Sequence, residues 1–481
     1  MTKTLWAKGY THDATIARFE AARNAAFDAA LAESDILGSL AHARMLRRAE
    51  LLSASDWLAL DGALRELLAE AQAGALVPSA EEEDIHTLIE RLLVERIGEA
   101  GKRLHTGRSR NDQALVDIRL YTKEALAEVA QKALTLADTL GAFAGAHEWV
   151  PMPGYTHMQR AMLSSVGLWS ASYAEALLDD LIPLSAAWAL NNQCPLGSAA
   201  AYGAPLPLDR AYVAKLLGFG ALHHNTLTAA NARGKIEAAT IQALALIMLD
   251  LSKWAQDVLL FTTSEYGFFT APQELCDGSS IMPQKRNLSA LELVRARAQT
   301  VIALQGQALA TLAGLPSGYN MDYQETKQPL IEALSLTAAS LEVVTLFAAG
   351  LKPRRENLEA ACAAELFATD RAYELVALGM PFRDAYRVVA AEPGAQEPGD
   401  LVMRLRKRAH AGAPGALDLP GVSARIAAEQ ATWQARARQF HTALAALGSG
   451  HMPAPNVGAH EAAPSASATA APSDIAIAFG I

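Results

Sequence analysis

The segment of residues 278–287, Gly-Ser-Ser-Ile-Met-Pro-Gln-Lys-Arg-Asn, combines residue types that suit the chemistry of anions. It separates two long apolar stretches that predict helices, so we expect it to be a loop. Its glycine and serines leave backbone N–H groups free to hold a carboxylate or to stabilise an alkoxide on Ser279. Lys285 adds a positive charge beside any bound anion. The alternative is a solvated connector, because glycine, proline and serine are common in such connectors.

A second polar segment, residues 105–113 with the sequence His-Thr-Gly-Arg-Ser-Arg-Asn-Asp-Gln, precedes the first long apolar stretch. Hydroxyl, guanidinium and amide groups gather at Ser109, Arg110 and Asn111, where we expect a helix to begin. Such a group at a helix N-terminus suits carboxylate recognition. The structural alternative is a polar cap, in which Ser109 or Asp112 serves only the start of the helix.

The third segment, residues 154–160, reads Gly-Tyr-Thr-His-Met-Gln-Arg and places His157 directly after Thr156. We expect a long helix to run from about Met158 to residue 190, with His157 at its entrance. A histidine in that position can exchange protons near neutral pH. The alternative is a surface or capping histidine, which is the better interpretation for most of the 12 histidines in the chain.

The fourth segment, residues 318–327, reads Gly-Tyr-Asn-Met-Asp-Tyr-Gln-Glu-Thr-Lys. Tyr319, Gln324 and Lys327 supply a phenol, an amide and an ammonium group, which together can bind a polar group like that of an amino acid. The alternative is the charged first turn of a helix.

Long helices must position these segments. Five stretches that contain little proline or glycine predict them, at about residues 109–147, 158–190, 229–266, 288–312 and 322–351. Helices in globular proteins average about 11–12 residues, so helices of this length imply a bundle with facing apolar stripes. We therefore expect an N-terminal helical domain (1–108), a central bundle (109–352) and a C-terminal domain of shorter helices (353–447). Residues 448–481, rich in alanine, proline and serine, predict a disordered tail without a catalytic role.

Composition narrows the class of protein further. Hydrophobic residues make up 51% of the 481 residues, and the net charge is −10, which gives no general attraction to nucleic acid or to an anionic membrane. No uninterrupted apolar stretch of about 18 residues supports a membrane span. The three cysteines are widely separated and form neither a metal-ligand pattern nor a disulfide framework, so we expect a cytoplasmic protein.

The pattern Gly-Ser-Ser-x-Met-Pro-x-Lys-x-Asn at 278–287 resembles the signature loop of the fumarase/aspartase superfamily. The other segments resemble the branch of that superfamily that contains argininosuccinate lyases and delta crystallins. The resemblance covers residues from about 5 to 447. It implies an all-α fold, with a central bundle of five long helices flanked by two smaller helical domains. It also implies a homotetramer whose active sites each draw on three subunits, and a reaction that uses no metal and no cofactor.

The implied activity is the reversible β-elimination of argininosuccinate to arginine and fumarate, the last step of arginine biosynthesis. The resemblance gives catalytic roles to Ser279, Lys285 and His157, and pairs His157 with Glu292. Either Ser279 or His157 is the base, and the other residue then handles the proton of the leaving group. The positions that resemble substrate contacts in the family are Asn24, His86, Ser109, Arg110, Asn111, Thr156, Arg233, Asn287, Tyr319, Gln324 and Lys327. For His86 a structural role is the alternative.

Three other functions remain open from the sequence. Another lyase of the superfamily would share the 278–287 loop, so the segments at 105–113 and 319–327 must discriminate between substrates. A non-catalytic structural protein of the crystallin type predicts damage to the catalytic set, yet Ser279, Lys285, His157 and Glu292 are all present. A helical scaffold or binding module explains the long helices but not the polar segments at their ends.

Overall fold

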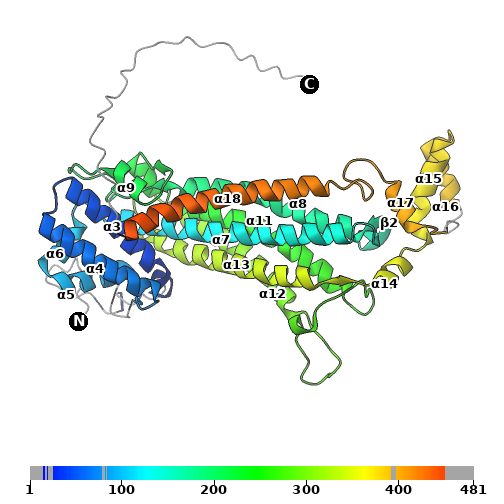
Figure 1. Ribbon diagram of the computed structural model, residues 1–481, viewed down its shortest axis with the longest axis horizontal. Coiled ribbons are helices and arrows are strands. Elements are labelled where there is room, and N and C mark those ends of the chain that lie inside the picture. The colour runs from blue at the N-terminus through cyan, green and yellow to red at the C-terminus, as the bar shows by residue number, and fades with distance from the viewer. Residues whose placement is uncertain are drawn as a thin grey trace, which may run out of the picture.

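The computed structural model describes residues 25–78, 84–391 and 397–449, together with Asp13, Thr15, Ile16, Phe19 and Glu82. Its architecture is all-α, with only short two-stranded sheets (Figure 1). Figure 1 shows an elongated bundle, with small helices gathered at one end and a separate lobe at the other.

Five long helices form the central bundle, as the lengths of the apolar stretches predict. They are α7 (Arg110–Ala146), α8 (Val166–Asn191), α11 (Lys235–Phe261), α12 (Ser289–Leu312) and α13 (Lys327–Gly350). Helix α8 continues through Pro183 without a break. The all-α fold with a bundle of five long helices is confirmed.

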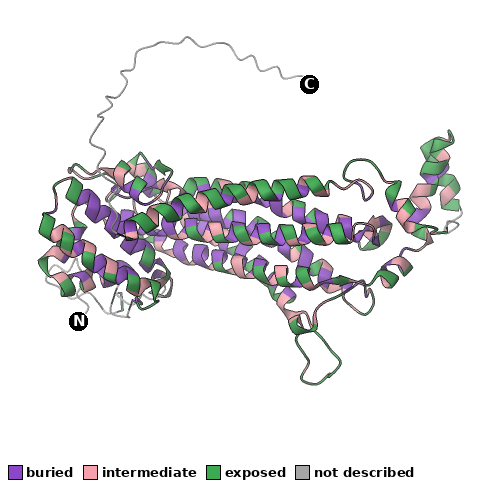
Figure 2. Cartoon of the chain, viewed as in Figure 1, coloured by how far each residue is buried: buried purple, intermediate pink, exposed green. Residues whose placement is uncertain are grey.

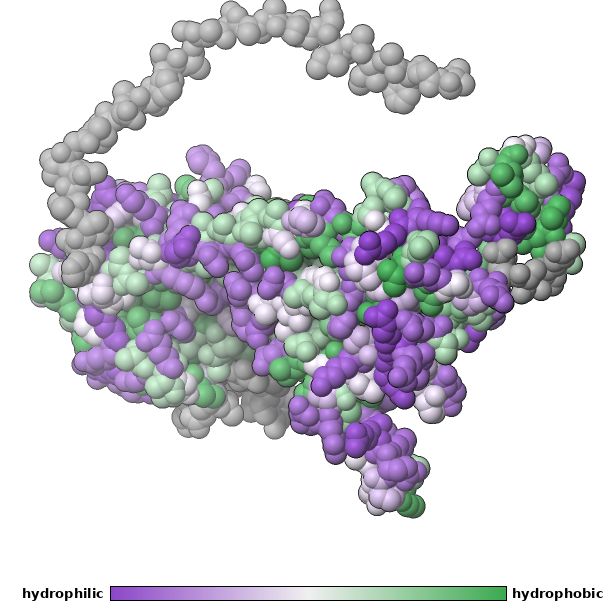
Figure 3. Space-filling model, turned by 45° about the vertical axis from the view of Figure 1, so that its right-hand side comes forward, coloured by the Kyte–Doolittle hydropathy of each residue, from purple (hydrophilic) through white to green (hydrophobic). Residues whose placement is uncertain are grey.

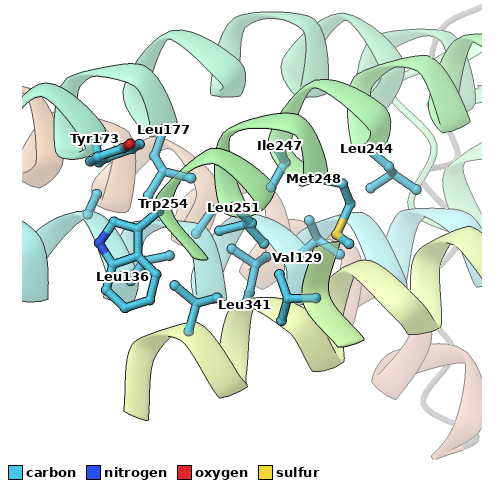
Figure 4. Packing of buried hydrophobic residues seen from close by; sticks show 14 of the residues in the cluster. Val129, Leu136, Tyr173, Leu177, Leu244, Ile247, Met248, Leu251, Trp254 and Leu341 are labelled. Carbon is cyan, nitrogen blue, oxygen red and sulfur yellow. The ribbon is translucent and has the colours of Figure 1, made fainter. Parts of the chain in front are cut away.

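The bundle is held together by a continuous apolar core. Leu136 of α7, Leu177 of α8, Leu251 of α11 and Leu341 of α13 all lie in it, each at most 2% exposed (Figure 4). Trp254 is buried among them. Burial of a leucine-sized side chain contributes about 1.5–3 kcal/mol, so this seam is the main source of stability. Met321–Gly350, which includes α13, is long and apolar enough to cross a membrane by length and composition, and half of its most apolar window is buried inside the protein.

A second, smaller core fills the N-terminal end. Its elements are α2 (Ala25–Asp28), η1 (Ala29–Leu31), α3 (Ala32–Arg48), α4 (Ala54–Gln72), α5 (Ile85–Ile97), α6 (Glu99–Lys102) and η2 (Arg103–His105). Buried leucines of α3, α4 and α5 pack there against the first turns of α7. The short elements β3 (Gln193–Cys194), α9 (Arg210–Leu216), β4 (Ala221–Leu222) and α10 (Thr226–Asn231) connect α8 to α11.

The opposite end carries a separate helical lobe. It contains α14 (Arg355–Ala360), η5 (Ala364–Phe367), α15 (Ala368–Ala377), α16 (Phe382–Ala391) and α17 (Leu401–Arg406). Strands β5 (Phe269–Thr270) and β6 (Lys352–Pro353) pair at its base. We expected only shorter helices after residue 353, but α18 (Leu419–Gly448) has 30 residues and returns along α7 and α8 to the N-terminal end (Figure 1). Of the expected tail, residues 450–481 lie outside the described residues.

One expected helix start is wrong. Residues 158–165 do not belong to the second bundle helix, because β1 (Pro151–Thr156) and β2 (Gln159–Ser165) form an antiparallel hairpin and α8 begins only at Val166. Ser165 caps α8 by accepting a hydrogen bond from the N–H of Leu168 at 3.1 Å.

Two other helices begin later than expected. Gly234, with φ at 77°, separates α10 from α11, and residues 232–234 are not helical. A Cβ at Gly234 would collide with the side chain of Leu312, so only glycine fits this close turn. Residues 321–326 form a 3₁₀ turn, η4 (Met321–Thr326), before α13. A further 3₁₀ turn, η3 (Gln273–Leu275), precedes the 278–287 loop.

Candidate active site

The second polar segment lies at the N-terminus of α7. Ser109 is the N-cap residue, and it forms a capping box with Asp112, whose carboxylate accepts a hydrogen bond from the N–H of Ser109 at 2.9 Å. The other Asp112 oxygen accepts hydrogen bonds from the N–H groups of Gly197 and Ala199. Ser109 and Asp112 therefore cap the start of α7, as the structural alternative predicts.

The arginines of this segment hold the neighbouring helices. Arg108 donates to the Ser39 hydroxyl of α3 at 2.8 Å, and Arg110 donates to the Thr87 hydroxyl of α5 at 2.6 Å. Arg110 also lies 3.6 Å from a carboxylate oxygen of Asp84. Two guanidinium groups therefore converge where α3, α5 and α7 meet, which makes this corner suited to an anionic ligand.

His86 lies beneath this corner between two buried carboxyl groups. Its Nδ1 contacts Asp35 at hydrogen-bonding distance and lies 3.5 Å from Asp117. Burial alone would lower the pKa of His86, but the charges of Asp35 and Asp84 outweigh it and raise that pKa. Burial alone would raise the pKa of Asp35, but His86, Arg108 and a hydrogen bond from Gln113 lower it.

A second set of predicted residues meets at the start of α11. Arg233, which is 2% exposed, donates to the Gln324 amide oxygen at 3.3 Å, and the Gln324 amide nitrogen donates to the Tyr319 hydroxyl at 3.2 Å. The guanidinium carbon of Arg233 lies 5.5 Å from the centroid of the Tyr319 ring. Three residues chosen from separate segments therefore form one connected polar group.

Lys327 is the first residue of α13 and forms an ion pair within the chain. Its ammonium group donates to a carboxylate oxygen of Asp28 at 2.6 Å, and both side chains are buried. Asn24 lies outside the described residues.

The 278–287 loop projects away from the bundle between η3 and α12 and is mostly exposed (Figures 1 and 2). Asp277 and Asn287 close its base with a pair of backbone hydrogen bonds of 2.9 Å. The Ser279 hydroxyl accepts from the N–H of Met282 at 3.1 Å and from that of Ile281 at 3.4 Å. The expected loop is therefore present, and backbone donors converge on Ser279.

His157 and Met158 form the two-residue turn of the β1–β2 hairpin, and both are exposed. Their φ angles are 53° and 62°, a left-handed conformation that is uncommon for residues other than glycine, asparagine and aspartate. Thr156 precedes the turn and lines a cavity of about 730 Å³ between the hairpin and helices α15 and α17. The cavity is also lined by Met162, Tyr373 and Arg404.

These groups stay apart within one subunit. Helix α7 has 37 residues and is therefore about 55 Å long, with Ser109 before its first turn and the His157 hairpin beyond its last. Helix α12 has 24 residues, so about 36 Å separates the loop from the end of α12 that contacts Gly234. Glu292 is exposed in the first turn of α12, and no hydrogen bond or ion pair between described residues joins it to His157.

Sequence reasoning missed three acidic residues beside the predicted contacts. Asp28, Asp35 and Asp117 are each at most 1% exposed. The available signal was an acidic residue within the mostly apolar stretches that form α2, α3 and α7, since a buried acid requires a specific partner. That signal is clear only once it is known that both faces of these helices are covered.

Known proteins resemble this chain over nearly its whole length. The profile of a family described as "Lyase" matches residues 9–303. An argininosuccinate lyase of Sorangium cellulosum is 43% identical over 89% of this chain and 99% of that relative. An argininosuccinate lyase of Thermotoga neapolitana is 38% identical over 82% of this chain and all of that relative.

A solved structure of EDDS lyase in complex with formate shares the fold, with a TM-score of 0.77 and 22% identity over 88% of this chain and 91% of that one. The 278–287 loop, the polar corner of α7 and the Arg233 group belong to a chain that these two relatives match over 89% and 82% of its length. This chain belongs to the argininosuccinate lyase family.

Proposed function

We propose that this protein splits argininosuccinate into arginine and fumarate by reversible β-elimination. One observation supports this proposal most strongly. The chain belongs to the argininosuccinate lyase family and has Ser279, whose hydroxyl accepts hydrogen bonds from two backbone N–H groups. The reaction removes a proton from the carbon beside a carboxylate, and the charge left behind spreads onto that carboxylate. An enzyme must stabilise this charge more strongly in the transition state than in the bound substrate.

The loop supports the proton-accepting oxygen of Ser279 and offers a positive charge to the developing anion. The N–H groups of Ile281 and Met282 point at the Ser279 oxygen, so they lower the cost of an alkoxide there. Lys285 lies on the same exposed loop and brings a fixed positive charge to the developing anion. Loss of one such preorganised contact typically costs about 2.7–4 kcal/mol of transition-state stabilisation.

His157 completes the proton transfers. With Ser279 as the base, His157 protonates the leaving guanidino nitrogen and Glu292 stabilises its imidazolium. With His157 as the base, Ser279 takes the opposite role. The exposed position of His157 at a hairpin tip suits either role, because the side chain reaches outward from its own subunit.

Two groups bind the ends of the substrate. Ser109, Arg110 and Asn111, with His86 beneath them, offer cations and N–H donors to the carboxylates of the succinyl unit. Arg233, Tyr319 and Gln324, with Lys327 beside them, offer hydrogen bonds to the polar amino-acid portion. Thr156 and Asn287 add contacts from the hairpin and the loop.

The site is completed by a homotetramer, in which each active site draws on three subunits. The separation of the polar groups along α7 and α12 supports this assembly, because no single subunit brings them together. Large apolar side chains also remain exposed on the outer faces of the bundle helices: Ile182 and Leu190 of α8, Leu246 and Leu249 of α11, Leu293, Ile302 and Leu309 of α12, and Leu346 of α13. Large apolar side chains that remain exposed on bundle helices support an interface with other copies of the chain.

The proposal also covers the domain boundaries, the cellular compartment and the cofactor requirement. We place the domain boundaries near residues 108, 352 and 447, with a tail that takes no part in catalysis. The three free cysteines fit a reducing cytoplasm. The reaction needs no metal or organic cofactor, since proton transfer and anion stabilisation suffice.

The test is the substrate specificity of fumarate release. Purified protein is mixed with argininosuccinate, adenylosuccinate or aspartate, and fumarate is followed by its ultraviolet absorbance. We expect release from argininosuccinate alone. Release from another substrate would keep the role of the loop and overturn the assignment of the binding groups. No release from any of them by a tetrameric protein would favour a structural role of the crystallin type.

A further inference from the structure

Asp117 of α7 has an unusual environment for an acidic side chain. It is fully buried, and neither of its carboxyl oxygens accepts a hydrogen bond from a described residue. Its nearest polar neighbours are His86, 3.5 Å away, and the carboxyl group of Asp35, and the ligand atoms of all three lie within 4.8 Å of one another. A buried carboxylate without donors is very costly, so this group needs a proton or a cation.

Asp35 shows the opposite pattern. It accepts hydrogen bonds from the Gln113 amide at 2.8 Å and from the Ser39 hydroxyl at 3.3 Å, and its Oδ2 contacts Nδ1 of His86. These are the surroundings of an ionised carboxylate, because each donor stabilises negative charge. Asp35 therefore carries the negative charge of the cluster, and Asp117 does not.

The charged groups around the cluster balance without a metal ion. On one side, Asp28 of α2 is paired with Lys327 of α13. On the other side, the carboxylates of Asp84 and Glu90 face the two cations Arg110 and Arg108.

A neutral Asp117, an ionised Asp35 and a protonated His86 add no net charge to these pairs. An ionised Asp117 would add an uncompensated negative charge to a site with 0% exposure.

We propose that Asp117 is a permanently protonated carboxylic acid that donates its proton to the Asp35 carboxylate, which in turn holds His86 as an imidazolium cation. Burial and the adjacent Asp35 both raise the pKa of Asp117 well above its usual value, in agreement with this arrangement. Asp117 is thus a positioning residue, which acts on the binding corner through Asp35 and His86.

The consequence for substrate recognition rests on the proposed function. His86 lies one residue from Thr87 and two from Asp84, the two partners of Arg110. A permanent positive charge at His86 reinforces Arg110 against the dianionic succinyl end of the substrate. His86 therefore serves as a fixed cation there, and does not exchange protons during turnover.

The decisive variant is Asp117→Asn, because an asparagine has the shape and the hydrogen-bond donor of a protonated aspartate. We expect an unchanged melting temperature, an unchanged KM and an unchanged pH profile. Asp117→Ala removes the donor and leaves a cavity, so it lowers the melting temperature and raises KM.

Asp112→Asn is the matched control. It makes the same exchange in a buried aspartate five residues earlier, but both oxygens of Asp112 accept backbone N–H groups. An amide cannot accept on its NH₂ side, so this variant melts at a lower temperature. If Asp117→Asn were destabilised like Asp112→Asn, an ionised Asp117 would be indicated and the proposal overturned.

Two readouts do not depend on activity. The infrared difference between wild-type protein and Asp117→Asn at neutral pH should show loss of a protonated carboxyl band. Loss of a carboxylate band would contradict the proposal. The alternative is that the cluster binds a metal ion, and elemental analysis tests it. A stoichiometric divalent cation in the wild type that is absent from Asp117→Asn would make the cluster a metal site. Failure of the proposed function would leave the infrared and melting results unchanged.

Discussion

In the proposed reaction, Ser279 is the residue on which the chemistry depends most directly. Its hydroxyl accepts hydrogen bonds from two backbone N–H groups in the single chain, and the same two donors would face an anionic oxygen at this position. We expect Ser279→Ala to bind argininosuccinate with nearly unchanged affinity and to lose turnover by about 10²–10⁴-fold, as expected for a general acid or base. Calorimetric titration and single-turnover kinetics separate the two effects. Normal turnover in this variant would refute the assignment of Ser279.

At the residue scale, the sequence pointed to candidate catalytic and binding groups but not to the buried acids beside them. Ser279 and Lys285 were identifiable because the ten-residue pattern at 278–287 resembles a family signature, whereas a polar loop alone could be a solvated connector. Arg233, Tyr319 and Gln324 were chosen from separate segments, and the fold joins them. Asp35 and Asp117 were missed because their importance comes from burial, which depends on packing between helices distant in sequence.

Helix α7 also carries a buried lysine whose titration affects stability. Lys123 donates to the Gly218 carbonyl at 2.8 Å and lies 4.1 Å from the ring centroid of Phe440 in α18 and 5.5 Å from that of Trp188 in α8. Burial lowers the pKa of Lys123 from 10.5 to about 7. Above pH 7 the unfolded chain therefore binds a proton at this site that the folded chain does not bind.

The titration of Lys123 makes the free energy of unfolding depend on pH. The free energy of unfolding rises with pH between about 7 and 10.5, because the unfolded state binds more protons there. We expect Lys123→Met to be more stable than wild type below pH 7, with a gain that shrinks as the pH rises toward 10.5. Urea unfolding at fixed protein concentration across this range measures the difference. A difference that does not vary with pH would show that Lys123 keeps its ordinary titration.

Among the elements, the β1–β2 hairpin is one that sequence patterns could not reveal. Its turn needs two residues with positive φ, and such turns usually carry asparagine or aspartate followed by glycine. Here His157 and Met158 occupy both positions, so the usual signal is missing. The long helices were predictable for the opposite reason, since length, apolar periodicity and the scarcity of proline act locally along the chain.

At the scale of the whole molecule, the proposed site groups lie far apart in the single chain. The binding corner, the 278–287 loop and the His157 hairpin lie at separate places on the bundle (Figure 1). Hydrophobic residues are also gathered on the outlying lobe of α15 and α16 (Figure 3), where Leu378 is 82% exposed and Tyr386 is 58% exposed. No pattern within one chain specifies how copies assemble, and this is why the active site itself could be predicted only through resemblance.

A shared site predicts that two inactive variants restore activity to one another. Subunits with His157→Ala and subunits with Ser279→Ala are dissociated together and reassembled. Some sites of the mixed tetramers then receive His157 from one subunit and Ser279 from another, so fumarate release reappears. Each variant reassembled alone serves as the control and stays inactive. If the mixed tetramers are inactive, the same subunit must supply both His157 and Ser279 to each site.

The central claim is that this protein breaks the bond between the guanidino nitrogen and the succinyl carbon of argininosuccinate. The most direct measurement is proton NMR of the complete reaction mixture, which quantifies argininosuccinate, arginine and fumarate together. We predict that arginine and fumarate appear in equal amounts as argininosuccinate disappears, and that the same protein forms argininosuccinate from added arginine and fumarate. Unchanged argininosuccinate in the presence of tetrameric protein, or fumarate released without arginine, would contradict the account.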